Sequence, residues 1–119
     1  MNDEYAKVNF QRGVTLLVLL SLLKREDMYG YQLVQSFEAL SGGLLRTQEG
    51  SLYPVLYKLL DKGYITDKRV LSGKRMVRIY YHLEPSGVQY LQELERDYRT
   101  ITAGVMKILD GGESSDEQR

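Results

Sequence analysis

The sequence has no cysteine and only one histidine, His82, among its 119 residues. Without thiols the chain can form neither disulfide bonds nor thiolate metal sites, and one imidazole is too few for a zinc or iron site made by protein ligands. There is also no histidine beside a candidate serine, no phosphate-binding glycine loop and no clustered carboxylate pair. We therefore expect a protein that is not an enzyme and that needs no cofactor or metal, and we expect His82 to be structural.

A long apolar run is absent as well. The longest, Val14–Leu23, is interrupted by Ser21 and is about half of the roughly 20 residues that a bilayer requires. The first residues carry neither the basic opening nor the small-residue cleavage site of a signal peptide. The composition, 43% hydrophobic and 27% charged, is typical of one ordinary soluble domain. We expect a cytoplasmic protein with no membrane partner.

Net charge is zero, but the charges are unevenly distributed along the chain. Residues 46–82 contain eight basic and three acidic residues, a net of +5, whereas residues 83–119 carry a net of −4 and residues 1–45 a net of −1. A concentrated basic region on a neutral protein is the usual electrostatic footprint of contact with a phosphate backbone. The distribution therefore favours double-stranded DNA as a partner.

Apolar spacing predicts three helices in the first half of the chain. The first extends from about Phe10 to Lys24, and the second from about Tyr29 to Leu40, with Tyr29, Leu33, Phe37 and Leu40 on its inner face. Residues 44–46 are expected to form a very short strand. Thr47 is positioned to cap the third helix, which begins near Glu49 and stops at Gly63.

The third helix has one apolar face and one outward face that can contact a partner molecule. The residues predicted to be buried are Leu52, Val55, Leu56, Leu59 and Leu60. Those predicted to face outward together are Ser51, Tyr53, Pro54, Tyr57, Lys58 and Lys62.

Two alternating segments follow, residues 64–70 and 76–83, and residues 71–75 join them as a β-hairpin. Its tip carries Lys74 and Arg75. Its arms carry Lys68, Arg69 and Arg78, while Ile65, Val77, Ile79 and Tyr81 are expected to face the helices. Three helices followed by a basic two-stranded wing make a winged helix-turn-helix, a mainly α fold of the α+β kind.

The last helix opens near Pro85, which suits an early helical position. Its apolar residues alternate at spacings of three and four, the pattern of a coiled-coil seam, so we expect this helix to pair with a second copy. The seam residues are Leu91, Leu94, Tyr98, Ile101, Val105 and Ile108. The organisation is then a DNA-binding domain at 1–83, a dimerisation helix at 84–110 and a disordered tail at 111–119.

Four motifs follow one another along the chain: YGYQL (29–33), EGSLYPVL (49–56), LDKGYI (60–65) and RIYYHL (78–83). Together, in this order, they resemble the PadR family of transcriptional regulators, and the similarity covers roughly residues 10–109. The resemblance implies a sequence-specific DNA-binding regulator, a repressor that acts as a homodimer on a palindromic operator. The short C-terminal helix is similar to that of the smaller subgroup, which dimerises through this helix and the first one.

In a winged helix the third helix enters the major groove and the wing contacts phosphates or the minor groove. The candidate operator contacts are Thr47, Ser51, Tyr53, Pro54, Tyr57, Lys58 and Lys62, and the candidate backbone contacts are Lys74, Arg75 and Arg78. Few of these side chains are long donors or acceptors, so we expect modest base discrimination and a large salt-dependent term. Two alternatives stay open: Tyr53 is a packing residue, or the third helix binds a partner protein instead of DNA.

The resemblance also implies a small effector between the two subunits, flat and aromatic or cationic. Tyr98 on the seam could stack on such a ligand, and Asp97 could neutralise a cation. The alternative is that Tyr98 only fills its seam position. The surfaces similar to the family's ligand site would offer Phe10, Val14, Leu17, Asp97 and Tyr98.

Overall fold

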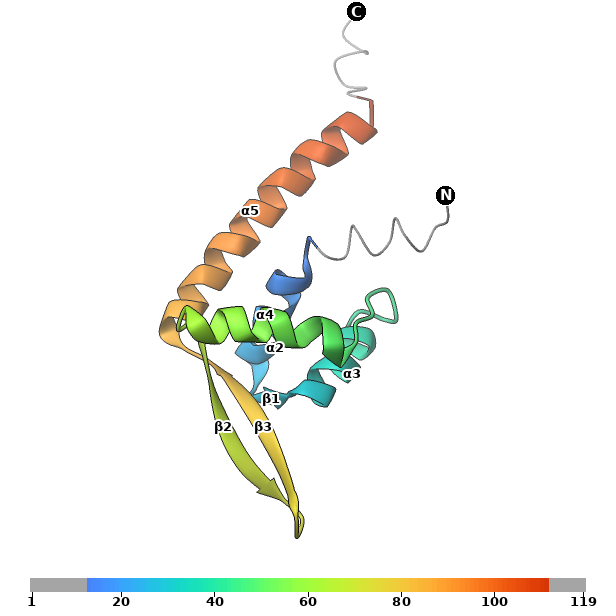
Figure 1. Ribbon diagram of the computed structural model, residues 1–119. Helices are drawn as coiled ribbons and strands as arrows, with labels where there is room; N and C mark the ends of the chain where they lie inside the picture. The colour runs from blue at the N-terminus through green and yellow to red at the C-terminus, as the bar shows by residue number, and fades with distance from the viewer. Residues whose placement is uncertain (1–12, 112–119) are drawn as a thin grey trace, which may run out of the picture.

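The computed structural model describes residues 13–111, which form four helices and three strands (Figure 1). The onset predicted at Phe10 and most of the predicted tail lie outside these residues. In chain order the elements are α2 (Thr15–Arg25), β1 (Met28–Tyr29), α3 (Gly30–Leu40), α4 (Glu49–Asp61), β2 (Ile65–Ser72), β3 (Met76–Leu83) and α5 (Pro85–Leu109). This is a winged helix-turn-helix with a long C-terminal helix, which confirms the predicted fold class.

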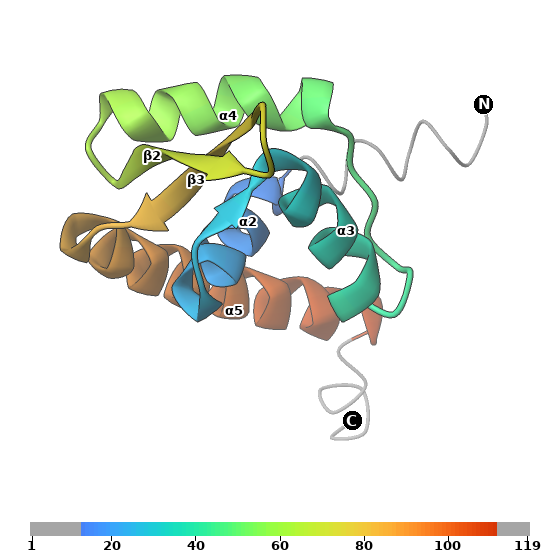
Figure 2. The same ribbon diagram turned by 90° about the horizontal axis from the view of Figure 1, so that it is seen from below.

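One apolar core holds the helices together. Leu19 and Leu20 of α2 lie at its centre with no exposed surface, and Leu33 of α3 and Leu56 of α4 are equally enclosed. Burying one such side chain contributes about 1.5–3 kcal/mol, so α4 is fixed mainly by its apolar face. Figure 2 shows α4 and α5 on opposite sides of the molecule, with α2 and α3 between them. The predicted buried face of α4 is confirmed, with Val55 and Leu60 partly buried at its edges.

The prediction of a short strand at residues 44–46 was wrong. A short strand does exist, but it is β1, which pairs with β3 to give the sheet order β1-β3-β2. Tyr29 therefore lies in a strand and not on the inner face of a helix, and Leu40, predicted to be buried, is 55% exposed. After α3 the chain turns through Gly42 and Gly43 at positive φ, and the Leu45 amide donates to the Ser41 hydroxyl at 2.8 Å. The backbone amides of Leu44 and Leu45 both donate to Ser41, so they are not available to pair with a neighbouring strand.

The two ends of α4 differ from each other. At its start Gln48 is the capping residue and makes no side-chain capping bond, so the predicted cap at Thr47 was wrong. At its end Gly63 adopts a φ of 77°, and the amide of Tyr64 donates to the carbonyl of Leu59 at 3.0 Å. This is the Schellman arrangement that glycine permits, and it confirms Gly63 as the stop.

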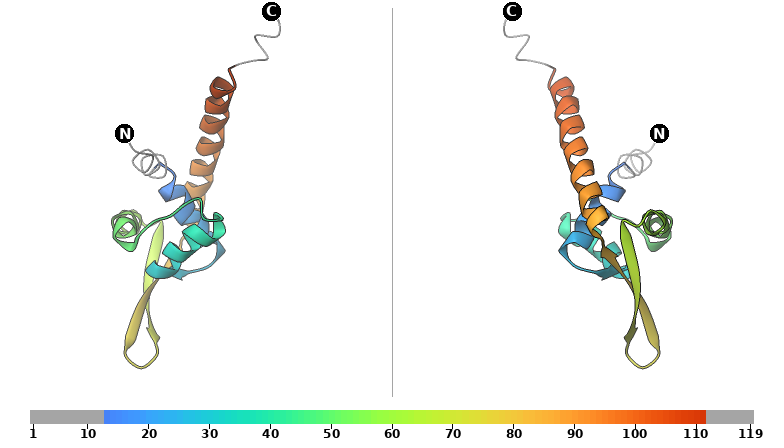
Figure 3. Two further views of the ribbon diagram at one scale, coloured as in Figure 1. Left: turned by 90° about the vertical axis from the view of Figure 1, so that its right-hand side faces the viewer. Right: turned by 90° about the vertical axis from the view of Figure 1, so that its left-hand side faces the viewer.

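The hairpin of β2 and β3 extends away from the helices, and α5 extends in the opposite direction (Figure 3). Ile65 and Tyr81, near its base, are buried as predicted. Val77 and Ile79 lie on the same side of β3 as Tyr81, towards α4 as expected, but they are 50% and 36% exposed because this part of the hairpin projects beyond the core. The wing is thus anchored at its base and more exposed towards its tip.

Helix α5 has a packed half and a free half. Its first turns lie so close to the end of α4 that a Cβ at Gly87 would collide with the carbonyl oxygen of Tyr64. The Ser86 hydroxyl also donates to the carbonyl of Gly63 at 2.9 Å. Beyond Leu94 the helix leaves the domain, and Ile101 and Ile108 are 66% and 80% exposed. The end of α4 and the start of α5 therefore form one tight junction.

Candidate nucleic-acid interface

The outward residues of α4 do not share one face, contrary to the sequence expectation. They separate onto two flanks, because residues 53 and 57 follow one helical stripe while residues 51, 58 and 62 follow another. Pro54 is exposed between the two flanks. On one flank lies a hollow between α4 and the wing, and on the other lies a groove between α4 and α2.

The hollow beside the wing, which we call the wing hollow, has a volume of about 430 Å³. Aromatic and apolar side chains dominate its lining, and its charged groups have both signs. The residues that define it are Tyr29, Gly30, Tyr31, Glu49, Tyr53, Tyr57, Asp67, Val77, Arg78, Ile79 and Tyr81.

Tyr53 is held inside the wing hollow by its own neighbours. Its hydroxyl donates to Glu49 Oε2 at 2.8 Å, and its ring stacks on Tyr57 with centroids 6.1 Å apart. The hydrogen bond to Glu49 and partial burial raise the pKa of Tyr53. A Cβ at Gly30 would lie 2.9 Å from the Tyr53 hydroxyl oxygen, so the glycine makes room for this side chain. These contacts favour the packing interpretation of Tyr53, whereas Tyr57 is exposed.

Arg78, in the half of β3 nearer the tip, is likewise engaged by its neighbours. Its guanidinium lies 4.4 Å from the centroid of the Tyr29 ring, and Tyr29 packs edge-on against Tyr80 at 5.3 Å. A cation over an aromatic face is stabilised by the ring quadrupole. Arg78 therefore helps to fix the short strand β1 against β3, in addition to any contact with a phosphate.

The wing tip carries two cationic side chains, Lys74 and Arg75, that are exposed to solvent. Lys74 and Arg75 follow Gly73, which turns the hairpin with a φ of 75°. Both side chains are exposed, as are Lys68 and Arg69 on β2. Within residues 13–111 no carboxylate forms an ion pair with Lys74 or Arg75.

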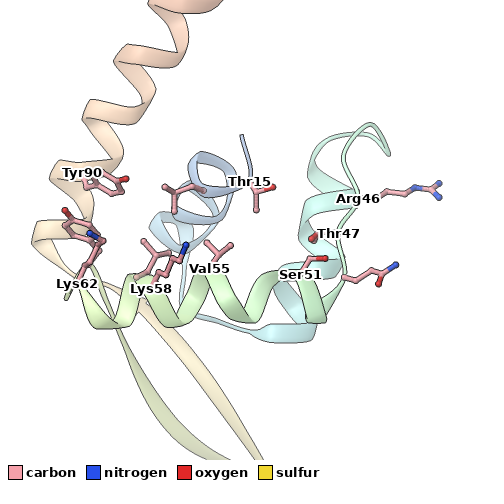
Figure 4. Close-up of a pocket in the computed structure, with 12 residues that line it drawn as sticks. Thr15, Arg46, Thr47, Ser51, Val55, Lys58, Lys62 and Tyr90 are labelled. Carbon is pink, nitrogen blue, oxygen red and sulfur yellow. The ribbon is translucent and has the colours of Figure 1, made fainter. Parts of the chain in front are cut away.

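The groove on the other flank of α4, which we call the basic groove, has a volume of about 580 Å³. Figure 4 shows Lys62 and Tyr90 at one end, Thr47 and Ser51 at the other, and Lys58 between them. Its charged side chains are all cationic. The residues that define it are Thr15, Leu16, Arg46, Thr47, Gln48, Ser51, Val55, Lys58, Leu59, Lys62, Tyr64 and Tyr90.

Several residues of this surface escaped the sequence analysis. Gln48, Tyr64, Tyr90 and Thr15 line the basic groove but were not proposed as site residues. The 3.6-residue period alone would have separated positions 51, 55, 58 and 62 from positions 53 and 57. No sequence signal marks Tyr64 and Tyr90, because their rings meet across two elements, stacked 4.4 Å apart.

His82 lies outside both concave surfaces. Its Nδ1 is 2.7 Å from Asp27 Oδ1, and its Nε2 is 4.0 Å from Glu84 Oε2. The hydrogen bond to Asp27 raises the pKa of His82. The side chain connects β3 with the turn before β1.

The predicted seam and effector residues have different surroundings. Leu91 is only 3% exposed because it packs in the domain's own core, and so it has little surface to offer a second copy. Leu94 is half-buried, while Tyr98, Ile101, Val105 and Ile108 are exposed. Val14 and Leu17 are half-buried, Asp97 is exposed, and none of them lines either concave surface. Phe10 lies outside the described residues.

No group of three or more histidine, aspartate or glutamate side chains among residues 13–111 could hold a metal ion. Over the same residues, no helix combines the length and the apolar character that spanning a membrane requires.

A family model, described as the transcriptional regulator PadR-like family, matches residues 19–93. The negative transcriptional regulator PadR of Bacillus subtilis (strain 168) is 31% identical over 75 residues, which is 63% of this chain and 41% of that relative. The chain spans 39% to 41% of the length of curated relatives of this kind.

Solved structures agree with this match. The crystal structure of a PadR family transcriptional regulator from Eggerthella lenta is similar with a TM-score of 0.78 and 30% identity, over 89% of this chain and 90% of that one. The structure of Bacillus subtilis PadR in complex with operator DNA has a TM-score of 0.63 and 30% identity, over 67% of this chain and 45% of that one. Residues 19–93, which the family model matches, include α3, α4 and the wing. The chain therefore belongs to the PadR-like family of transcriptional regulators, which is not a family of enzymes.

Proposed function

We propose that this protein is a DNA-binding transcriptional repressor that acts as a homodimer in the cytoplasm. The observation that carries the proposal is the position of α4 between two sets of cations, those of the basic groove and those of the wing tip. A relative with the same fold is known in complex with operator DNA. Another relative's name describes a negative regulator, which supports repression.

In the proposed complex α4 enters the major groove, and cations on both sides of it contact phosphates. Lys58 and Lys62, with Thr47 and Ser51, would contact the backbone on the side of the basic groove. Lys74 and Arg75 would contact it at the wing. Pro54 and the exposed Tyr57 are left as the residues nearest to the bases. Their apolar surfaces suit thymine methyl groups better than polar base edges, so specificity should depend strongly on half-site spacing and DNA shape.

The free half of α5 supports the proposed dimer. Tyr98, Ile101, Val105 and Ile108 present an apolar stripe that this chain does not cover within its described residues. Packing that stripe against a second copy would bury it, with Leu94 at its edge and Leu91 contributing little. The two copies of α4 would then lie about one DNA turn apart, roughly 34 Å, on a palindromic operator.

An effector site at the subunit boundary is part of this proposal. Tyr98 is 45% exposed, and the adjacent Asp97 is also exposed. A flat aromatic or cationic molecule would stack on the ring and pair with the carboxylate. Leu17 of α2 and the preceding Val14, with Phe10, would complete the proposed site and couple its occupancy to release of DNA.

Fluorescence anisotropy with a labelled random duplex tests the DNA-binding function. We expect binding at low salt that weakens steeply as salt rises, because phosphate contacts release counterions. Absence of binding at low salt would support the alternative, a winged-helix module that binds a partner protein. Recovery of bound fragments from a genomic pool would then identify the operator.

A further inference from the structure

The wing hollow has the volume of a small-molecule site and is rich in aromatic rings. Its volume of about 430 Å³ lies within the roughly 300–1,000 Å³ typical of ligand pockets. Residues of α4 line one side and residues of the hairpin line the other, while β1 and the start of α3 complete it. Five of the chain's ten tyrosines line this hollow, so aromatic side chains are concentrated there.

Three of these tyrosines are held in place by their own neighbours. Tyr53 donates a hydrogen bond to Glu49 and stacks with Tyr57, with an angle of 21° between the ring planes. Tyr81 is 3% exposed. Burial, with smaller electrostatic effects of Tyr53, Tyr57 and Asp67, raises the pKa of Tyr81 to about 12, so these side chains lie around its hydroxyl. A site that is ordered in advance loses little conformational entropy when a ligand binds.

The charged groups of the hollow favour a cation. The carboxylates of Glu49 and Asp67 line it from α4 and β2, and no lysine is among its lining residues. Both carboxylates are exposed, and neither forms an ion pair within residues 13–111. The one cationic lining residue, Arg78, already lies over the Tyr29 ring at 4.4 Å. The hollow therefore holds one cation of its own chain on an aromatic face, while its two carboxylates have no cationic partner.

The lining also selects among possible ligands. A phosphate or a sulfonate would be repelled by the two carboxylates. A quaternary ammonium ion has no N–H group that needs a hydrogen-bond acceptor, and it is attracted to the negative faces of aromatic rings. Tyrosine rings beside carboxylates are therefore complementary to such an ion.

We propose that the wing hollow binds a small quaternary ammonium ion. The ammonium group contacts the rings of Tyr53 and Tyr57 and is neutralised by the carboxylates of Glu49 and Asp67. This site is separate from the proposed effector site on the free half of α5, because α4 and α5 lie on opposite sides of the molecule (Figure 2).

Occupancy of the hollow has a consequence for DNA. In the proposed complex both α4 and the wing contact DNA, so the carboxylates of Glu49 and Asp67 lie beside the duplex and repel its phosphates. A bound ammonium ion offsets this negative charge and strengthens DNA binding, and by linkage DNA strengthens binding of the ion. This consequence rests on the proposed function, whereas binding of the ion does not.

Binding is tested on the full chain with choline, a quaternary ammonium ion, by NMR titration of the tyrosine ring signals. The matched neutral probe is 3,3-dimethyl-1-butanol, which has the same shape with carbon in place of the charged nitrogen. We expect saturable shifts of the Tyr53 and Tyr57 signals with choline, and at least tenfold weaker binding of the neutral probe. The ring signals of Tyr98 report separately on the proposed effector site.

Variants show which groups recognise the ion. E49Q/D67N removes both charges and keeps acceptor oxygens, and it should weaken choline binding at least fivefold. Tyr57→Leu removes an exposed ring, keeps an apolar side chain and should also weaken choline binding. The control E26Q/E93Q removes two exposed carboxylates that do not line the hollow and should bind choline as the wild type does. Thermal unfolding of each variant should match that of the wild type, so that a loss of binding reflects the site and not the fold.

Three results would overturn the site. The first is equal weakening of choline binding by E49Q/D67N and by E26Q/E93Q. The second is binding of the neutral probe as tight as that of choline. The third is the absence of saturable shifts at Tyr53 and Tyr57.

Coupling to DNA is measured separately, by anisotropy of a random duplex in choline chloride and in the same concentration of sodium chloride. Choline should strengthen duplex binding at least twofold for the wild type and not for E49Q/D67N. Wild-type affinity that is unchanged or weaker in choline would refute the coupling. If the duplex fails to bind even without choline, the proposed function fails, and the NMR titration still decides whether the hollow binds the ion.

Discussion

The two flanks of α4 differ in charge and in how firmly their side chains are held. In the wing hollow Tyr53, Glu49 and Arg78 are engaged by hydrogen bonding or by ring contacts. In the basic groove Lys58 and Lys62 are exposed, and no ion pair occupies them within residues 13–111. One flank therefore holds its side chains in place, while the other leaves two exposed lysines for the proposed phosphate contacts.

Both flanks depend on the same buried face of α4. Leu56→Ala removes a fully enclosed side chain from that face and should lower the free energy of unfolding by about 2–5 kcal/mol. Urea denaturation followed by circular dichroism measures the change. Tyr57→Ala, at an exposed position one residue away, is the control and should cost much less. Equal losses for the two variants would mean that α4 is not anchored as described.

The free half of α5 should be needed for dimerisation and not for folding of the domain. I101E/V105E places carboxylates on the exposed stripe and should give monomers by light scattering, because their burial against a second copy would be costly. The unfolding midpoint of the winged domain should change little at matched low concentration. A persistent dimer would exclude this stripe as the interface.

Tyr53→Phe tests the assignment of the wing hollow as a positioning flank. Loss of the hydroxyl removes the hydrogen bond to Glu49 and should cost roughly 0.5–1.5 kcal/mol of stability or less, because the bond is partly exposed. Duplex affinity should change less than twofold by anisotropy. A tenfold loss of affinity with intact stability would instead make the Tyr53 hydroxyl a DNA contact.

The raised pKa of His82 predicts a small dependence of the free energy of unfolding on pH. Because the pKa of His82 is raised in the folded state, its contribution is fully present below the unfolded pKa of about 6.5 and is lost as pH rises through the folded value. The exposed pair with Asp27 should contribute no more than about 0.5 kcal/mol. His82→Gln should therefore narrow the difference in stability between pH 5.5 and pH 8 (thermal melts). If the difference in stability between pH 5.5 and pH 8 is the same in His82→Gln as in the wild type, the pair of His82 and Asp27 does not contribute to stability.

The sequence predicted most of the fold because its signals are local. Gly63 marks a helix end through its own backbone, and the apolar spacing of α4 records its buried face. Strand β1 was missed because it has two residues and its partner, β3, lies about fifty residues further along the chain. Val77 and Ile79 share the face of Tyr81 as expected, but their exposure was not predicted, because strand alternation shows which side chains share a face and not where the core beneath that face ends.

The basic residues of the site were predicted from the sequence, but their arrangement around α4 was not. The basic region at residues 46–82 was evident from charge counting, and all the proposed cations occur in it. The assignment of Tyr53 and Lys58 to one outward face failed because the buried stripe of α4 leaves two flanks with different neighbours. Those neighbours, the wing and the junction of α2 with α5, are set by tertiary packing.

The salt dependence of duplex affinity tests the central comparison most directly. We predict that K58Q/K62Q and K74A/R75A each reduce the slope of log affinity against log salt by about two phosphate contacts. E49Q/D67N, in the wing hollow, should leave the slope unchanged and raise affinity slightly by removing negative charge. Slopes that change with the wing hollow variant, but not with K58Q/K62Q, would contradict the assignment of the two flanks.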